Sequence, residues 1–94
     1  MVKHIVIYTL KNKDGREKTI EMIRGLLEPL VGQIPGLLHL EIRANEKGPM
    51  DYALYSEFES REALANYAVH PLHLAAKEQF FPLLDQRYSA DYEV

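Results

Sequence analysis

Cysteine is absent from this 94-residue sequence, so disulfides, thiolate chemistry and zinc sites of the cysteine type are excluded. Basic residues form no block, because all 11 are spread along the chain among 14 acidic residues, for a formal charge of −3. Binding to nucleic acid through its phosphates is therefore not expected. Tryptophan and cofactor motifs are absent as well. We predict no cofactor, and haem- or flavin-linked chemistry ranks last among the functions considered.

The sequence also lacks a long hydrophobic run. The opening VKHIVIYTL is a short apolar stretch with one basic residue, so we expect neither a signal peptide nor a membrane span and predict a cytoplasmic protein. What the chain does have is 47% hydrophobic and 27% charged residues, which is typical of a globular protein. At this length we expect a single domain over residues 1–94.

Four segments have the composition or alternation of β-strands. They are rich in β-branched and aromatic residues, or alternate apolar with polar side chains, at residues 2–10, 37–44, 51–58 and 87–94. In the second segment the alternation predicts that Leu38, Leu40 and Ile42 face the core while their neighbours face solvent.

Two regions between these strands have helical periodicity. Asp14 is the expected N-cap of the first helix, and Pro29 should kink or break that helix near its end. Ser60 is the expected N-cap of the second region. Because a residue before proline disfavours helical geometry, this region should break just before Pro71 and continue as a second helical run over 71–85.

The order β-α-β-β-α-β predicts an α+β fold, in which one four-stranded antiparallel sheet carries both helices on one face. The fourth strand should pair with the first. The first strand is apolar on both faces, so either Ile5 and Ile7 or Val6, Tyr8 and Leu10 would face water on the uncovered side. An apolar face of several strands is too large to leave exposed. We therefore expect a homodimer in which two sheets pack face to face as a dimeric α/β barrel.

Antiparallel pairing of the first and fourth strands brings His4 and Asp91 to the same edge, and the helix break could lean over that edge. The side chains that could then converge are His4, Tyr67, His70, His73 and Asp91. A helix's first turn disfavours the protonated form of His73, and a neutral histidine suits general-base work. Asp91 could fix the tautomer of that ring. Tyr67 or His4 could donate a hydrogen bond to a substrate oxygen.

Each of these residues also has a simpler interpretation. His70 is more readily a helix-junction residue, Tyr67 and His4 can be satisfied core residues, and Asp91 can be an exposed strand-end carboxylate. His39 and Tyr52 are interpreted as a surface and a core residue.

A divalent metal could be held by His70, His73 and Asp91. The break at Pro71 need not leave the two histidines on one face, and no acidic cluster flanks them. We predict no metal. Nucleophilic catalysis has no support either, since no serine lies in an elbow motif.

The segments VKHIVIYTLK, IPGLLHLE, SEFESREALANYAVHPLH and DYEV, in this order, resemble the stress-responsive dimeric α/β-barrel (Dabb) family over essentially the whole chain. The resemblance implies a ferredoxin-like subunit in a barrel-forming homodimer. The family contains a plant polyketide cyclase, olivetolic acid cyclase, which performs an aldol cyclisation without a cofactor. By this resemblance His73 and Tyr67 would be catalytic, Asp91 would orient them and His4 would line the pocket.

The chain departs from the cyclase at two places. Tyr52 stands where a further pocket histidine is expected, and residues 16–34 contain no tyrosine. Two hypotheses follow. The first is a homodimeric stress-type protein that binds a small hydrophobic ligand in a pocket between sheet and helices. The alternative is a cofactor-independent acid/base enzyme, cyclase- or isomerase-like, acting on a carbonyl compound. A pocket lined by His4, Tyr67 and His73 favours the enzyme, whereas side chains packed shut favour the structural role.

Overall fold

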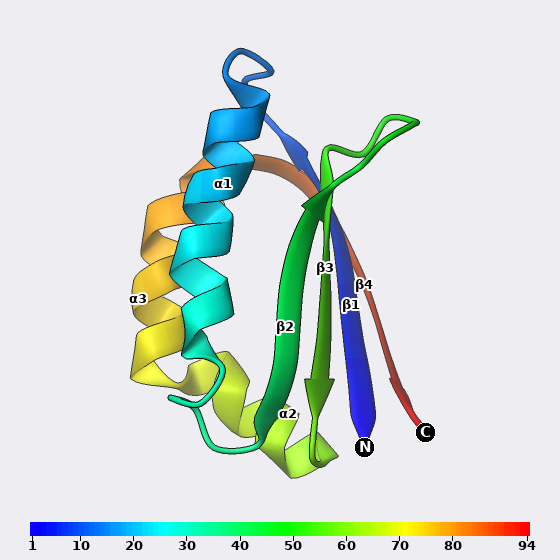
Figure 1. The fold of residues 1–94 in the computed structure, drawn as a ribbon, viewed down its shortest axis with the longest axis vertical. Coiled ribbons are helices and arrows are strands. Elements are labelled where there is room, and N and C mark those ends of the chain that lie inside the picture. Colours follow the sequence, from blue (N-terminus) through cyan, green and yellow to red (C-terminus); the bar gives the residue numbers. More distant parts are fainter.

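A four-stranded antiparallel sheet forms one layer of the molecule and helices form the other, in a computed structural model that describes residues 1–94. The elements, shown in Figure 1, are β1 (Val2–Leu10), α1 (Arg16–Leu27), β2 (Leu37–Ala44), β3 (Tyr52–Phe58), α2 (Arg61–Val69), α3 (Pro71–Phe80) and β4 (Leu84–Glu93). Short 3-10 turns, Glu28–Leu30 and Phe81–Leu83, follow α1 and α3. The strand order β2-β3-β1-β4 is that of the predicted ferredoxin-like α+β fold.

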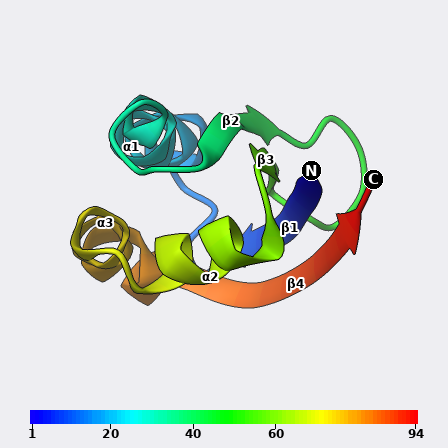
Figure 2. The ribbon, with the colours of Figure 1, turned by 90° about the horizontal axis from the view of Figure 1, so that it is seen from below.

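All helices lie on one face of the sheet, with α1 and α3 side by side along it and α2 across one end (Figure 1 and Figure 2). The core between the layers contains 20 buried hydrophobic residues. Alternation along β1 sends Val6 and Tyr8 into this core, while Ile7 on the opposite face is 38% exposed. Of the two arrangements that the sequence left open, the structure has Ile5 and Ile7 on the uncovered side.

The first helix starts and ends for reasons of local backbone geometry. The prediction that Asp14 caps it is wrong, because Gly15 occupies the N-cap position with φ of 68° and no side chain caps the helix. Glycine adopts this left-handed conformation without steric cost. The predicted break at Pro29 is confirmed, since α1 ends at Leu27 and Pro29 lies in the following 3-10 turn.

The break between α2 and α3 is confirmed. Ser60 caps α2 as expected, because its side chain accepts a hydrogen bond from the Ala63 amide at 3.1 Å. His70 then has extended backbone geometry and Pro71 is the first residue of α3. The predicted helical run to residue 85 is wrong. A 3-10 turn containing Pro82 ends the helix at Phe80, and β4 begins earlier than the predicted residue 87.

One inward-facing residue of β2 was predicted wrongly. Leu38 is 46% exposed and Leu37 is buried instead. The pairing register with β3 shifts between Leu37 and His39, which inserts one residue and reverses the alternation at the start of the strand. Beyond the shift, Leu40 and Ile42 face the core as predicted.

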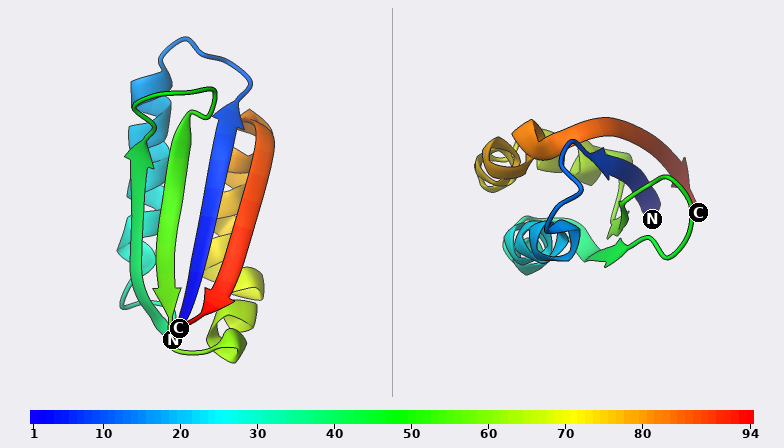
Figure 3. Two further views of the ribbon diagram at one scale, coloured as in Figure 1. Left: turned by 90° about the vertical axis from the view of Figure 1, so that its right-hand side faces the viewer. Right: turned by 90° about the horizontal axis from the view of Figure 1, so that it is seen from above.

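The face of the sheet opposite the helices is uncovered in the monomer, and Figure 3 shows all four strands from this side. Tyr88, opposite Ile7, and Tyr92, opposite Lys3, are 57% and 45% exposed there. Several large apolar side chains are thus grouped on one open surface. None of the helices is both long and apolar enough to cross a membrane.

Candidate functional site

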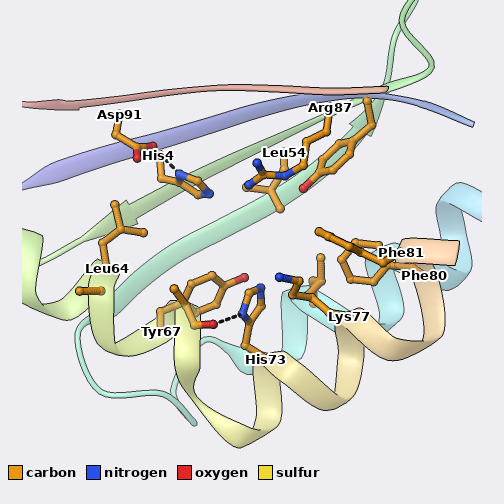
Figure 4. Close-up of a pocket in the computed structure, with 14 residues that line it drawn as sticks. His4, Leu54, Leu64, Tyr67, His73, Lys77, Phe80, Phe81, Arg87 and Asp91 are labelled. Carbon is orange, nitrogen blue, oxygen red and sulfur yellow. Dashed lines mark hydrogen bonds and ion pairs between the residues drawn. The ribbon is translucent and has the colours of Figure 1, made fainter. Parts of the chain in front are cut away.

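A pocket of about 220 Å³ lies between the covered face of the sheet and the helices α2 and α3 (Figure 4). Its apolar wall includes Leu27, Leu54 and Phe80, all of which are core residues. The side chains with a polar group that line it are His4, Tyr8, Tyr67, His73, Lys77, Arg87 and Asp91. Four of these were predicted to converge, and the structure brings all four to the same cavity.

His73 lies in the first turn of α3 and is half-buried. Its Nδ1 is 3.3 Å from the carbonyl oxygen of Ala68, in the preceding helix. A carbonyl oxygen can only accept, so Nδ1 carries the hydrogen and the lone pair of the ring is on Nε2. Burial lowers the pKa of His73, and the nearby charges of Lys77 and Arg87 lower that pKa further. The ring is therefore neutral at neutral pH.

Asp91 has a different partner from the one predicted. His4 and Asp91 are directly opposite each other on β1 and β4, and the Nδ1–H of His4 donates to the Asp91 carboxylate. The expectation that Asp91 orients His73 is therefore wrong. Residues in register on adjacent antiparallel strands have their Cβ atoms close together, whereas His73 projects from α3 on the other side of the pocket (Figure 4). The contact leaves Nε2 of His4 available to a ligand.

Tyr67 connects the core to the pocket. It is 4% exposed, and its ring packs against Phe58 and against the imidazole of His73, with centroid separations of 5.0 Å and 4.1 Å. Burial raises the pKa of the Tyr67 phenol, so the hydroxyl stays protonated and can donate a hydrogen bond. In Figure 4 this hydroxyl points into the cavity alongside His73.

Two cations of the lining, Lys77 and Arg87, were not predicted from the sequence. Lys77 follows His73 by four residues, so both lie on one face of α3. Arg87 precedes Asp91 by four residues in β4 and therefore points to the same face of the sheet. The spacing of four residues from His73 in the helix and from Asp91 in the strand is the sequence feature that could have predicted that Lys77 and Arg87 line the pocket.

The remaining candidates lie outside the pocket lining. His70 caps α3, where its Nδ1 accepts a hydrogen bond from the Leu72 amide at 3.1 Å. Tyr52 is fully buried and stacks on Tyr8, and its hydroxyl has no hydrogen-bond partner. His39 is exposed on the outer face beside Glu41. No group of three or more histidine and acidic side chains is placed to hold a metal ion in residues 1–94.

A family model and two related proteins that match this chain all carry the same description, a stress-response A/B barrel domain. The family model described as "Stress responsive A/B Barrel Domain" (Dabb) matches residues 2–94. Two relatives from Arabidopsis thaliana are described as stress-response A/B barrel domain-containing proteins. One is 32% identical over 98% of this chain and 88% of its own length. The other is 29% identical over 98% of this chain, which spans only 36% of the length of that relative.

Solved structures show the same fold. A dimeric protein of unknown function with a ferredoxin-like fold from Bacteroides fragilis has a TM-score of 0.89 and 28% identity, covering 99% of this chain and 95% of that one. A hydroxynitrile lyase from Passiflora edulis has a TM-score of 0.82 and 23% identity, covering 99% of this chain and 92% of the other.

Proposed function

The chain belongs to the stress-responsive A/B barrel (Dabb) family, and we propose that it is a homodimeric, cofactor-independent acid/base catalyst acting on a small carbonyl compound. The observation that carries the proposal is the orientation of the His73 ring in the pocket. The ring is neutral, its Nδ1–H is held by the Ala68 carbonyl, and its Nε2 is left free beside the Tyr67 ring in an open pocket. A neutral, oriented imidazole is the usual requirement for a general base at neutral pH.

The size and lining of the pocket support a small, flat ligand. A cavity of about 150 Å³ accommodates benzene, so about 220 Å³ accommodates a ligand with on the order of ten non-hydrogen atoms. Leucine and phenylalanine side chains form much of the apolar wall. A single ring with a short carbonyl-bearing substituent fits this description.

The proposed step is removal of a proton from the carbon next to the carbonyl group. Nε2 of His73 accepts the proton while the C–H electron pair forms a C=C bond and the carbonyl π pair moves to oxygen. The Tyr67 hydroxyl donates a hydrogen bond to that oxygen, where negative charge develops. Return of the proton to another atom gives isomerisation. In cyclisation the enolate carbon forms a C–C bond to a second carbonyl carbon, the π pair of that carbonyl moves to its oxygen, and this oxygen takes the proton from His73. His4, held by Asp91, is the second group able to exchange a proton with the ligand.

The uncovered face of the sheet supports the homodimer. Ile7, Tyr88 and Tyr92 are large apolar side chains exposed together on it, and patches of this kind mark interaction sites. The Bacteroides fragilis relative of the same fold is described as dimeric. We expect the interface of this chain to bury at least about 1,200 Å² in total.

The test is exchange of α-protons for deuterium in D₂O, followed by NMR, with phenylacetone as a neutral probe of suitable size. The wild-type protein should accelerate exchange, and His73→Ala should reduce the acceleration by about 10²-fold or more. Lys18→Ala, at an exposed position of α1 outside the pocket lining, is the control and should have no effect. Acceleration that survives His73→Ala would contradict the assigned base.

A second function, ligand binding without turnover, is favoured by one observation. Asp91 pairs with His4, so His73 has no carboxylate behind it. In that case phenylacetone would shift the NMR signals of pocket residues in a His73-dependent way, while the exchange rate would equal that of buffer. The hydroxynitrile lyase with this fold supports the catalytic alternative, because it indicates that the fold can carry an enzyme.

A further inference from the structure

Two cationic side chains line the pocket without a compensating acid. Lys77 and Arg87 both belong to its lining, and neither takes part in any ion pair of the structure. They come from opposite walls, Lys77 from α3 and Arg87 from β4, and Figure 4 shows both reaching into the cavity. The chain as a whole carries a formal charge of −3. A positive pocket in an acidic protein is therefore a local feature of these two residues.

The only acidic side chain of the lining does not neutralise them. Asp91 is bonded to His4. The Nζ of Lys77 lies 4.3 Å from the centroid of the Phe81 ring, which also lines the pocket. An ammonium over an aromatic face is held in place without losing its charge. Arg87 lies next to the phenol of Tyr8, whose pKa is raised by burial and lowered in part by the guanidinium. Lys77 therefore lies over an aromatic ring and Arg87 lies beside a neutral phenol, and neither cation is paired with an acidic side chain.

We infer that the ligand of this pocket is a small planar oxo acid, whose carboxylate is bound between Lys77 and Arg87 while its carbonyl oxygen faces Tyr67. The inference rests on the proposed function, which it deepens by naming the class of substrate. A guanidinium and an ammonium are the side chains that recognise a carboxylate, through charge-assisted hydrogen bonds. The aromatic and leucine side chains of the wall accept the flat apolar body of such a ligand.

The same two charges would assist the chemistry. The enolate formed from an oxo acid carries a second negative charge beside the carboxylate, and a positive environment stabilises it in the transition state. Burial lowers the pKa of His73, and the charges of Lys77 and Arg87 act in the same direction, so the base is neutral before the substrate enters. The positive charges of Lys77 and Arg87 would therefore favour both binding of the substrate and removal of its proton.

The experiment compares phenylpyruvate with its primary amide, which has the same number of non-hydrogen atoms and no charge. Dissociation constants are measured by NMR titration of pocket signals at low salt and at about 0.5 M NaCl. Wild-type protein should prefer phenylpyruvate roughly tenfold at low salt, and the preference should shrink at high salt. Lys77→Met and Arg87→Met should each remove most of this preference, because each should weaken binding of phenylpyruvate much more than binding of the amide.

Lys18→Met is the matched control, since Lys18 is an exposed lysine of α1 outside the pocket lining and its loss changes the net charge equally. It should retain the tenfold preference. Folding of each variant is checked by the position of amide signals from the core. Equal affinity of wild-type protein for acid and amide would overturn the inference while leaving the proposed function standing, provided that amide binding still depends on His73. Failure of both probes to shift pocket signals would overturn both.

Discussion

Tyr67→Phe removes one oxygen atom from the pocket and leaves the packing of the ring in place. The Tyr67 ring contacts Phe58 and His73, and both contacts are made by the ring itself. The hydroxyl faces the cavity and is not sealed in the core, unlike that of Tyr52. Loss of such a hydroxyl should change the free energy of unfolding by no more than roughly 1 kcal/mol.

The expected effect on catalysis is larger. Removing one donor to a developing oxyanion typically lowers kcat by about 10²- to 10³-fold, or roughly 2.7–4 kcal/mol of transition-state stabilisation. Tyr67→Ala removes the ring as well, and truncating a buried aromatic side chain costs about 3–5 kcal/mol of stability. The two variants therefore separate the chemical role of the hydroxyl from the structural role of the ring.

Two assays distinguish these effects. Urea unfolding at one fixed protein concentration gives stability, because the midpoint of a dimer depends on concentration. Deuterium exchange of phenylacetone in D₂O gives the rate. Tyr67→Phe should unfold close to wild type and exchange at about a hundredth of its accelerated rate. If Tyr67→Phe exchanges as fast as wild type, the hydroxyl does not assist the reaction and the assigned role is refuted.

Three further outcomes are expected. Burial lowers the pKa of His73 below its ordinary value of 6.5, so kcat/KM should stay level from about pH 8 down past 6.5 and fall only at lower pH, as the ring gains a proton; a fall centred at or above 6.5 would contradict this. Ile7→Asp or Tyr88→Asp should convert the dimer to monomer in sedimentation at micromolar concentration, since a charge would be buried without a partner; an unchanged dimer would exclude this face. Asp91→Asn should shift the imidazole ¹⁵N signals of His4 and leave those of His73 unchanged, because only His4 contacts the carboxylate.

Features set by local chemistry were predictable from the sequence. The break at Pro71 and the end of α1 near Pro29 follow from the fixed φ and missing N–H of proline, which act whatever the rest of the fold does. The cap at Ser60 depends on one side chain and an amide three residues away. The pairing that brings His4 opposite Asp91 followed from the antiparallel topology, which the order of elements predicts.

Features set by tertiary context were predicted wrongly or missed. The exposure of Leu38 depends on a one-residue register shift against β3, which no pattern within β2 reveals. The partner of Asp91 depends on how far α3 stands from the sheet, and this distance is fixed by the core residues between them. Lys77 was overlooked because a lone lysine at helical spacing is usually a solvated residue, and only the position of α3 over the pocket distinguishes it.

Because the chain turns at His70, between α2 and α3, the pocket is built from two pairs of residues that are each held together locally. Tyr67 and His73 are six residues apart and their rings pack against each other across this corner, so their relative position is determined by a short piece of chain. His4 and Asp91 are likewise fixed to each other, by sheet hydrogen bonds. The distance between the helical pair and the strand pair depends on the core side chains that lie between the helices and the sheet. Substitutions among those core residues would alter the volume of the pocket and leave the geometry within each pair intact.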